Sequence, residues 1–458
     1  MLSDTIAAVS TPYGKGGVAV IRISGDDAAA VLSRCFSTSG PRPEVHPRRA
    51  CFGRIVREEE TVDTGVATYF APGASFTGEA SAELSCHGGT AVTAAVLEAV
   101  FFAGARPAQA GEFTRRAFLN GKLSLTEAQA VGLMIDADTD SRRRLASGVL
   151  RGSLREATEQ MRASLTTLLA SLYATIDYPE EDLAEQSTEE VTAGFETITD
   201  ELRDLLATYR TGHAVADGVR TVICGAPNCG KSSLYNRILG EDRAIVTDIA
   251  GTTRDTLWDT ADFGGVSLRL ADTAGLRDGT EDQIEAIGIA RARKTMEEAE
   301  LILLVLDAAR PLAPEEDALL HTLRELDAST VVIVNKTDLA APEETIFAAR
   351  PYADAVVAIS AKTGDGMDAL ADAVAAIYGT RDRSYVTEPL IWDARHKATL
   401  TEAITLLERA ADALTAGEPS DAVCTLAEDA LAELSMLDGR GVSEEIVNEI
   451  FSRFCVGK

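Results

Sequence analysis

Residues 221–239 read TVICGAPNCGKSSLYNRIL, a β-branched run followed by a loop with a glycine at each end and then by apolar residues at helical spacing. Strand, glycine loop and helix in this order form a cradle for nucleotide phosphates. Gly225 and Gly230 let the backbone turn its N–H groups toward an anion, and the next helix presents its positive N-terminal end. Lys231 is placed to reach the β- and γ-phosphates, and Ser232 to ligate Mg²⁺. The stretch predicts a P-loop nucleotide-binding domain.

Three later motifs indicate which nucleotide is bound. Asp272-Thr273-Ala274-Gly275 follows a predicted strand at 267–271, where the aspartate can hold Mg²⁺ and the glycine N–H can sense a γ-phosphate. Asn335-Lys336-Thr337-Asp338 follows another strand, and Asp338 can accept hydrogen bonds from the N1–H and 2-amino groups of guanine. Adenine lacks this pair of donors, so such a site rejects it. Ser360-Ala361-Lys362 offers a backbone N–H to guanine O6, and we predict that the nucleotide is GTP.

The loop between the P-loop and Asp272 has the composition of a switch. Residues 247–255 read TDIAGTTRD, and a threonine here, for which we choose Thr253, can complete the Mg²⁺ shell while the γ-phosphate is present. Leu276 follows the Asp272–Gly275 motif, where small signalling GTPases have a glutamine that orients water. An aliphatic side chain cannot orient water, so that group must come from elsewhere in the chain.

The rest of the chain divides by its hydrophobic pattern. Residues 217–379 alternate apolar strands with helix-like stretches, which is typical of a doubly wound parallel sheet. Strand signals are absent from 121–216 and from 380–458, where apolar residues recur at helical spacing, while 1–120 mixes both patterns. We expect a multidomain α/β protein with an N-terminal α+β domain, a discontinuous all-α helical domain and an inserted Ras-like P-loop GTPase domain, because two short helical blocks can bury their apolar faces against each other.

Composition sets limits on function. A chain of 458 residues with 46% hydrophobic content is enough for about three domains. No apolar run approaches the roughly 20 residues of a membrane span, and the N-terminus, Met1-Leu2-Ser3-Asp4, lacks the basic start and apolar core of a signal peptide. We therefore expect a cytoplasmic protein without membrane association. The seven cysteines form no CxxC pair, which favours reduced thiols. A net charge of −29 argues against a broadly basic surface, so any RNA contact is local. The candidates are Arg42, Arg48, Arg49 and Arg54 in one region and Arg142, Arg143 and Arg144 in another.

The whole chain resembles the MnmE (also called TrmE) family of tRNA-modifying GTPases. The resemblance rests on 225–233, 249–255, 272–277 and Glu285-Ala286-Ile287-Gly288, and on two stretches that GTPases in general do not have. These are GEFTRRAFLNGK at 111–122 and the terminal FCVGK at 454–458. The resemblance implies a homodimer that works with an FAD-dependent partner, MnmG (GidA), in a heterotetramer. It implies addition of an aminomethyl-type group (carboxymethylaminomethyl) to C5 of the wobble uridine of certain tRNAs.

The resemblance also implies cofactors and site residues. A tetrahydrofolate derivative, in its 5,10-methylene or 5-formyl form, would be bound in the N-terminal domain by Arg22, Glu83, Lys122 and Lys458, with Glu79 as an alternative to Glu83. A potassium ion would lie beside the phosphates of GTP, held by Asn228, Thr247, Ile249 and Thr252. Magnesium would be held by Ser232 and Thr253. Glu285, to orient water, and Cys455 are the candidate catalytic residues.

The expected GTP-binding residues are Asn228, Cys229, Gly230, Lys231, Ser232, Ser233, Thr247, Asp248, Ile249, Ala250, Gly251, Thr252, Thr253, Asp272, Thr273, Ala274, Gly275, Asn335, Lys336, Asp338, Ser360, Ala361 and Lys362. We therefore expect a potassium-stimulated GTPase that forms part of a tRNA modification enzyme. A regulatory RNA-binding GTPase switch without modification chemistry explains 217–379 equally well. It explains neither the 111–122 stretch nor the C-terminal motif, and folate binding would distinguish the two.

Overall fold

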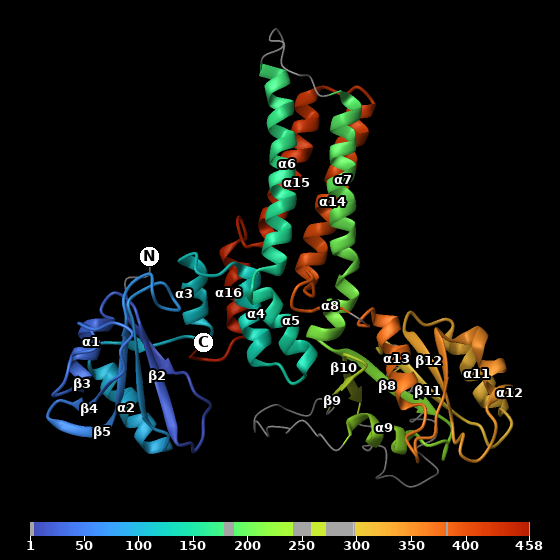
Figure 1. The fold of residues 1–458 in the computed structure, drawn as a ribbon, viewed down its shortest axis with the longest axis horizontal. Helices are drawn as coiled ribbons and strands as arrows, with labels where there is room; N and C mark the ends of the chain where they lie inside the picture. Colours follow the sequence, from blue (N-terminus) through green and yellow to red (C-terminus); the bar gives the residue numbers. More distant parts are fainter. Residues whose placement is uncertain are drawn as a thin grey trace. The chain divides into compact units, whose positions relative to one another are not determined.

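The computed structural model describes residues 4–177, 187–240, 258–271, 296, 298–381 and 383–457. Its internal contacts separate two compact units, one of Met1–Gly132 with Ser435–Lys458 and one of Leu133–Leu434 (Figure 1). The first unit therefore contains both ends of the chain, while the second contains the P-loop and most of the helices that flank it.

The first unit is built on a seven-stranded sheet in the order β3-β4-β5-β6-β2-β1-β7. All neighbours pair antiparallel except β1 and β7. Ile21 and Ile23 face a core that α1 and α2 cover, whereas Arg22 between them lies on the opposite face. The strands are β1 (Ile6–Val9), β2 (Val18–Ser24), β3 (Phe36–Ser37), β4 (Cys51–Arg57), β5 (Glu60–Phe70), β6 (Ser81–His87) and β7 (Arg106–Pro107). The helices over the core are α1 (Ala28–Cys35) and α2 (Thr90–Phe102), and the expected α+β domain is confirmed.

The C-terminal segment completes this unit. Helices α3 (Glu112–Leu119), α4 (Leu125–Ile135) and α16 (Glu444–Ser452) pack through a small apolar cluster that includes Leu125, Val447 and Phe451. Gly111 precedes α3 with φ +63°, and a side chain there would come within 2.5 Å of the Phe451 carbonyl oxygen. Only glycine allows this close approach without strain, so the 111–122 stretch accommodates the chain terminus.

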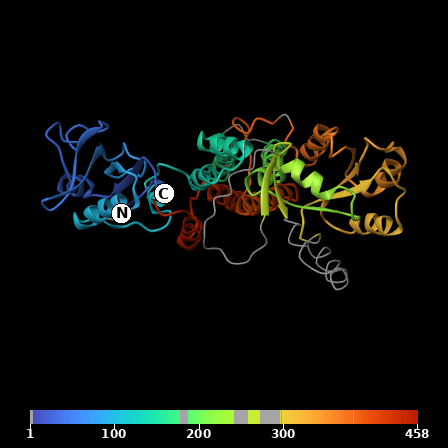
Figure 2. The ribbon, with the colours of Figure 1, turned by 90° about the horizontal axis from the view of Figure 1, so that it is seen from below.

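In the second unit, helices from before and after the strand-rich segment pack together. Helix α7 lies along α14, and an Arg203–Glu408 ion pair of 2.5 Å and a Tyr173–Glu428 hydrogen bond of 2.7 Å join the two segments. Figure 2 looks along these helices and shows that green and red parts of the chain lie together. The expected discontinuous helical domain is confirmed. Its helices are α5 (Asp140–Leu150), α6 (Ser153–Asp177), α7 (Thr188–Ala207), α8 (Tyr209–Ala216), α14 (Ala394–Thr415) and α15 (Ser420–Leu437).

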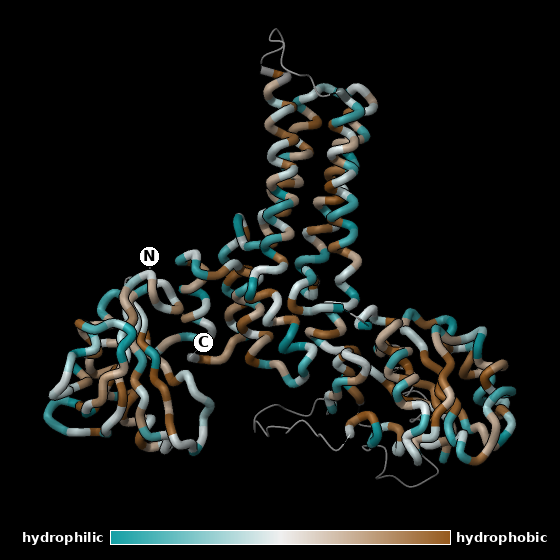
Figure 3. Tube along the Cα trace, in the orientation of Figure 1, coloured by the Kyte–Doolittle hydropathy of each residue, from teal (hydrophilic) through white to brown (hydrophobic). Residues whose placement is uncertain are grey.

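The inserted segment is a six-stranded sheet in the order β13-β12-β11-β8-β10-β9. Alternate residues of β11 enter two different cores, Leu301, Leu303 and Val305 on one face and Ile302, Leu304 and Leu306 on the other. Figure 3 shows the hydrophobic colour concentrated in the strands of this sheet, and β11 is buried along its length except at Asp307, as expected for a strand covered on both faces. The strands are β8 (Val219–Gly225), β9 (Trp258–Phe263), β10 (Val266–Ala271), β11 (Leu301–Asp307), β12 (Ser329–Asn335) and β13 (Ala355–Ala358). The helices are α9 (Lys231–Leu239), α11 (Pro314–Leu323), α12 (Glu343–Ala349), η2 (Arg350–Tyr352) and α13 (Met367–Tyr378).

The expectation of a purely parallel sheet was wrong at one edge. β9 pairs antiparallel with β10, and sequence analysis did not predict this strand. The signal was the Gly264-Gly265 pair, whose φ angles of +64° and +75° make the tight turn of a β-hairpin. The remaining five strands pair in parallel, as predicted.

Candidate functional site

The P-loop has the backbone that phosphate binding requires. β8 ends at Gly225 and α9 begins at Lys231, and between them Asn228 and Gly230 have φ angles of +60° and +107°. A side chain at Gly225 would lie 2.3 Å from the Val305 carbonyl oxygen, so the loop must pass close to the neighbouring strand. The Lys231 Nζ donates hydrogen bonds to the carbonyl oxygens of Gly225 (2.9 Å) and Ala226 (2.7 Å). The ammonium group therefore lies against the backbone of the loop that is expected to bind the phosphates.

Asn335 joins the P-loop to the 360–362 loop. Its Nδ2 donates to the Cys229 carbonyl oxygen (2.8 Å), and its Oδ1 accepts from the Ala361 N–H (2.9 Å). The side chain is 3% exposed and lies against Gly230, where a Cβ would come within 2.1 Å of Nδ2. Sequence analysis grouped Asn335 with the nucleotide-binding residues. Its hydrogen bonds show that it holds together the two loops expected to bind the phosphates and the base.

The remaining residues of the expected base pocket are also held in position. The Ser360 hydroxyl donates to Asp338 Oδ1 (2.8 Å), and Lys336, with φ +68°, forms an ion pair of 2.7 Å with Asp307 at the end of β11. Burial acts to raise the pKa of Asp307, but the hydrogen bonds from Lys336 and the Ala309 N–H lower it overall. Asp307 therefore keeps its negative charge opposite Lys336. Sequence analysis missed Asp307, although its position at a strand end was a signal.

Much of the expected switch lies outside the described residues. The residues concerned are Thr247, Asp248, Ile249, Ala250, Gly251, Thr252, Thr253, Asp272, Thr273, Ala274, Gly275 and Glu285. Lys458, expected at the folate site, also lies outside the described residues. The structure does describe the strands that flank the switch segments. β9 begins directly after residue 257, and β10 ends at Ala271, the residue before Asp272. Asn228 and Ser232, the described residues expected to ligate metals, are both exposed at the loop and the start of α9.

In the N-terminal unit, Arg22 and Glu83 form an ion pair with an Nη2–Oε1 distance of 2.9 Å across the β2–β6 ladder. The Arg22 guanidinium lies over two aromatic rings, 5.3 Å from the centroid of Phe76 and 5.8 Å from that of Phe113. The side chains of Arg22 and Glu83 are 21% and 33% exposed. The pair therefore combines charges with flat apolar surface and remains accessible to a ligand.

The loop that carries Phe76 also contacts Lys122. The Lys122 Nζ donates to the Gly73 carbonyl oxygen (3.1 Å), and the Asn120 Nδ2 to the Thr77 carbonyl oxygen (2.8 Å). Arg22 and Lys122 therefore both contact the 73–77 loop, and Glu83 pairs with Arg22. The C-terminal segment contacts the same unit, because Val456 pairs with Ala110 in a β-bridge.

Glu79, the alternative to Glu83, belongs to a more buried network. Its carboxylate accepts from the Ser24 hydroxyl (2.8 Å) and forms an ion pair of 3.1 Å with Arg116, whose side chain is 1% exposed. Arg116 also contacts Glu112 (3.0 Å) and Asp4 (2.8 Å). Sequence analysis missed this network, although Glu112 and Arg116 have the i, i+4 spacing of a helical ion pair. Glu79 therefore pairs with a buried arginine, whereas Glu83 pairs with Arg22, which is more exposed.

Two further expectations can be located. Cys455 is exposed, and its carbonyl oxygen accepts from the Gly111 N–H (3.4 Å), while the Ser10 hydroxyl donates to the Gly457 carbonyl oxygen (3.1 Å). Arg143 and Arg144 both form ion pairs with Asp140, at 2.7 and 2.6 Å, so part of the charge in this arginine cluster is matched within α5. In the described part of the chain, no helix has the length and apolar character to cross a membrane.

Comparisons with known proteins cover the whole chain. The model of the MnmE helical domain matches residues 125–455, and the model of the GTP-binding protein TrmE N-terminus matches residues 5–122. The tRNA modification GTPase MnmE of Symbiobacterium thermophilum is 42% identical and covers 100% of both chains. That of Acetivibrio thermocellus is 36% identical over 99% of both. A solved G domain of the T. maritima FeoB iron transporter matches 35% of this chain and 98% of its own at 25% identity, with a TM-score of 0.26.

The matched regions include residues 111–122, the first two residues of the 454–458 stretch, and the helices on either side of the P-loop domain. They also agree with the observed fold, in which a helical domain is interrupted by a nucleotide-binding sheet. The family models and the full-length relatives together show that this chain belongs to the MnmE family of tRNA modification GTPases.

Proposed function

We propose that this tRNA modification GTPase adds an aminomethyl-type group (carboxymethylaminomethyl) to C5 of the wobble uridine of certain tRNAs, using a one-carbon unit of tetrahydrofolate. It would act as a homodimer with the FAD-dependent MnmG. The observation that carries the folate proposal is the Arg22–Glu83 ion pair, in which the Arg22 guanidinium lies over the rings of Phe76 and Phe113. We assign this chemistry to residues 1–120, assign residues 121–216 and 380–458 to the helical domain, and assign residues 217–379 to the G domain.

The donor set around Arg22 suits a folate. A pterin ring presents N–H groups that a carboxylate such as Glu83 can accept, and its flat face can stack on an aromatic ring. Folates also carry carboxylates on their glutamate tail, which Arg22, Lys122 or the terminal Lys458 could meet. Tetrahydrofolate would supply the carbon that is transferred. The protein residues would bind and orient it, with Cys455 as a candidate catalytic residue close in sequence to Lys458.

The GTPase part of the proposal concerns metal ions. Ser232 and Thr253 would hold Mg²⁺, and Asn228 with Thr247, Ile249 and Thr252 would hold K⁺ beside the phosphates. A monovalent cation there would supply positive charge as the β–γ bond of GTP breaks. The exposed Asn228, with φ +60° in the P-loop, supports this role because its amide oxygen is not buried in the protein core. Glu285 would orient the attacking water, since Leu276 lacks a polar group.

Calorimetric titration with 5-formyl-tetrahydrofolate tests the folate site. We expect the intact chain to bind, and we expect binding to weaken at least about tenfold in Arg22→Ala, as for loss of a charged hydrogen bond. A chain lacking its last five residues should also bind more weakly. Arg57→Ala is a matched control, because Arg57, in β4 of the same sheet, pairs with Glu98 and lies over Phe102, both of α2. Absence of heat in the intact chain would favour the regulatory switch without modification chemistry.

Cys455 is tested separately. Cys455→Ser should retain folate binding and GTP hydrolysis, while a strain that carries it should lose the modified wobble uridine in its tRNA. A normal nucleoside profile in that strain would exclude a catalytic role for the thiol.

A further inference from the structure

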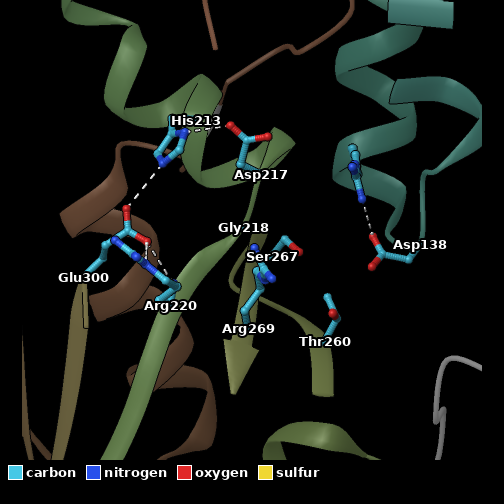
Figure 4. A pocket seen from close by; sticks show the side chains of 10 residues that line it. Asp138, His213, Asp217, Gly218, Arg220, Thr260, Ser267, Arg269 and Glu300 are labelled. Atoms are coloured by element: carbon cyan, nitrogen blue, oxygen red, sulfur yellow. Dashed lines mark hydrogen bonds and ion pairs between the residues drawn. The ribbon is translucent and has the colours of Figure 1, made fainter. Parts of the chain in front are cut away.

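A cavity of about 470 Å³ lies within the Leu133–Leu434 unit, beside the β9 edge of the nucleotide-binding sheet (Figure 4). Arg142 of α5 and Asp138 just before it form one wall, and His213 of α8 belongs to another. The third wall comes from β8, β9 and β10. A cavity of this size is in the range of about 300–1,000 Å³ found for small-ligand sites. It is distinct from both the P-loop and the Arg22–Glu83 pair.

The carboxylates of Asp138, Asp217 and Glu300 line the cavity together with four basic side chains, those of Arg142, His213, Arg220 and Arg269. Most of them are paired within the wall. Arg220 contacts Glu300 at 3.1 Å, His213 contacts Glu300 at 3.3 Å, and Arg142 contacts Asp138 at 3.4 Å. Hydrogen bonds to Asp217 and then Glu300 raise the pKa of His213 to about 9, so the imidazole is cationic at neutral pH.

Arg269 differs from these residues. Within the described part of the chain, no carboxylate forms an ion pair with it, and its guanidinium lies 5.9 Å from the ring centroid of Trp258. Figure 4 shows Arg269 between the cluster around Glu300 and the wall that carries Asp138, without a dashed line to either. Thr260 and Ser267, which also line the cavity, carry hydroxyl groups. The aromatic contact orients a cation whose planar N–H groups remain available for an oxyanion.

We propose that this cavity binds a phosphate group and that Arg269 is its main contact. Guanidinium groups bind phosphate oxygens through paired N–H donors, and hydroxyl groups can add neutral hydrogen bonds. The choice of phosphate over carboxylate rests on the tRNA modification function, because an RNA backbone is the polyanion that this family handles. Free inorganic phosphate has the same chemistry and is the alternative source.

The cavity is also placed to connect two parts of this unit. Its lining combines α5 and α8 of the helical domain with β9 and β10 of the sheet. β9 follows residues 241–257, which include Thr253, and β10 precedes Asp272. A phosphate bound here would therefore contact helices and also the strands that lead to the expected switch segments.

The test uses the full chain with its P-loop saturated by a non-hydrolysable GTP analogue and Mg²⁺, so that the P-loop does not contribute phosphate binding. tRNA affinity is measured from 50 to 200 mM salt, and inorganic phosphate is titrated separately, for the intact chain and for Arg269→Gln. The matched control is Arg324→Gln, an exposed arginine at the end of α11 with the same loss of charge. Circular dichroism checks the fold of each variant.

If the phosphate belongs to RNA, Arg269→Gln should weaken tRNA binding about tenfold and reduce the slope of log affinity against log salt by about one. If it is free phosphate, only the inorganic phosphate titration should change. Unchanged binding in both titrations would overturn the proposal, as would an equal loss in Arg324→Gln. Should Arg269→Gln fail to fold, Arg269→Lys keeps the charge but loses the paired donors, and unchanged binding in that variant would also overturn it. Folate titration is independent of all these outcomes, so failure here leaves the proposed chemistry untouched.

Discussion

Replacing Asn335 by alanine should weaken GTP binding without removing any residue expected to touch the phosphates. The variant loses the hydrogen bonds to the Cys229 carbonyl oxygen and from the Ala361 N–H, and both residues are buried, at 0% and 5% exposure. An unsatisfied buried polar group costs about 1–3 kcal/mol, so the two together cost about 2–6 kcal/mol, less whatever water in the vacated space recovers. The P-loop and the 360–362 loop would then no longer be held together.

Binding of fluorescently labelled GDP and thermal unfolding measure this effect. If about 1.4 kcal/mol of the cost falls on the bound state, affinity drops tenfold, and we expect at least that loss together with a lower unfolding midpoint. Asn335→Asp keeps the acceptor for Ala361 but places a carboxylate oxygen against the Cys229 carbonyl, so it should lose at least as much. Asn236→Ala, on the exposed side of α9, is the control and should behave as the intact chain. Normal affinity and midpoint in Asn335→Ala would refute the bridging role.

Three other predictions address the base, the metal and pH. Asp338→Asn should lose GTP affinity and could gain xanthosine triphosphate, whereas unchanged GTP affinity would contradict the guanine assignment. GTP turnover should be faster in potassium than in sodium and lose this difference in Asn228→Ala, and equal rates for the intact chain would exclude the potassium site. The pKa of His213 is raised to about 9, chiefly by its hydrogen bond to Asp217, so its contribution to stability is complete below pH 6.5 and is lost as the pH rises through 9. The unfolding midpoint should therefore fall more between pH 7 and 10 in the intact chain than in His213→Gln, and an equal fall in both would contradict this.

The nucleotide-binding motif could be predicted from the sequence because its strand, loop and helix are contiguous in the chain. The stretch from Thr221 to Leu239 contains its strand, its loop and its helix, and the glycines at 225 and 230 have the positive φ angles that the loop needs. The helical blocks could be predicted for a similar reason, because a helix is indicated by apolar residues that recur three or four positions apart.

Contacts between residues far apart in the sequence could not be predicted, and only the tertiary structure shows them. Asn335 reaches Cys229, 106 residues away, because β12, which ends at Asn335, and β8, which ends at Gly225, both pair in parallel with β11 and so end on the same side of the sheet. No spacing rule predicts which residue of the 335–338 motif holds the P-loop and which faces a base. The cavity beside Arg269 has the same origin, because its walls come from four segments whose distance in sequence is unrelated to their distance in space. The sequence alone determined the kinds of element and the chemistry of each motif, whereas the order of strands in the sheet decided which motifs meet, because backbone pairing and core packing act across the whole chain.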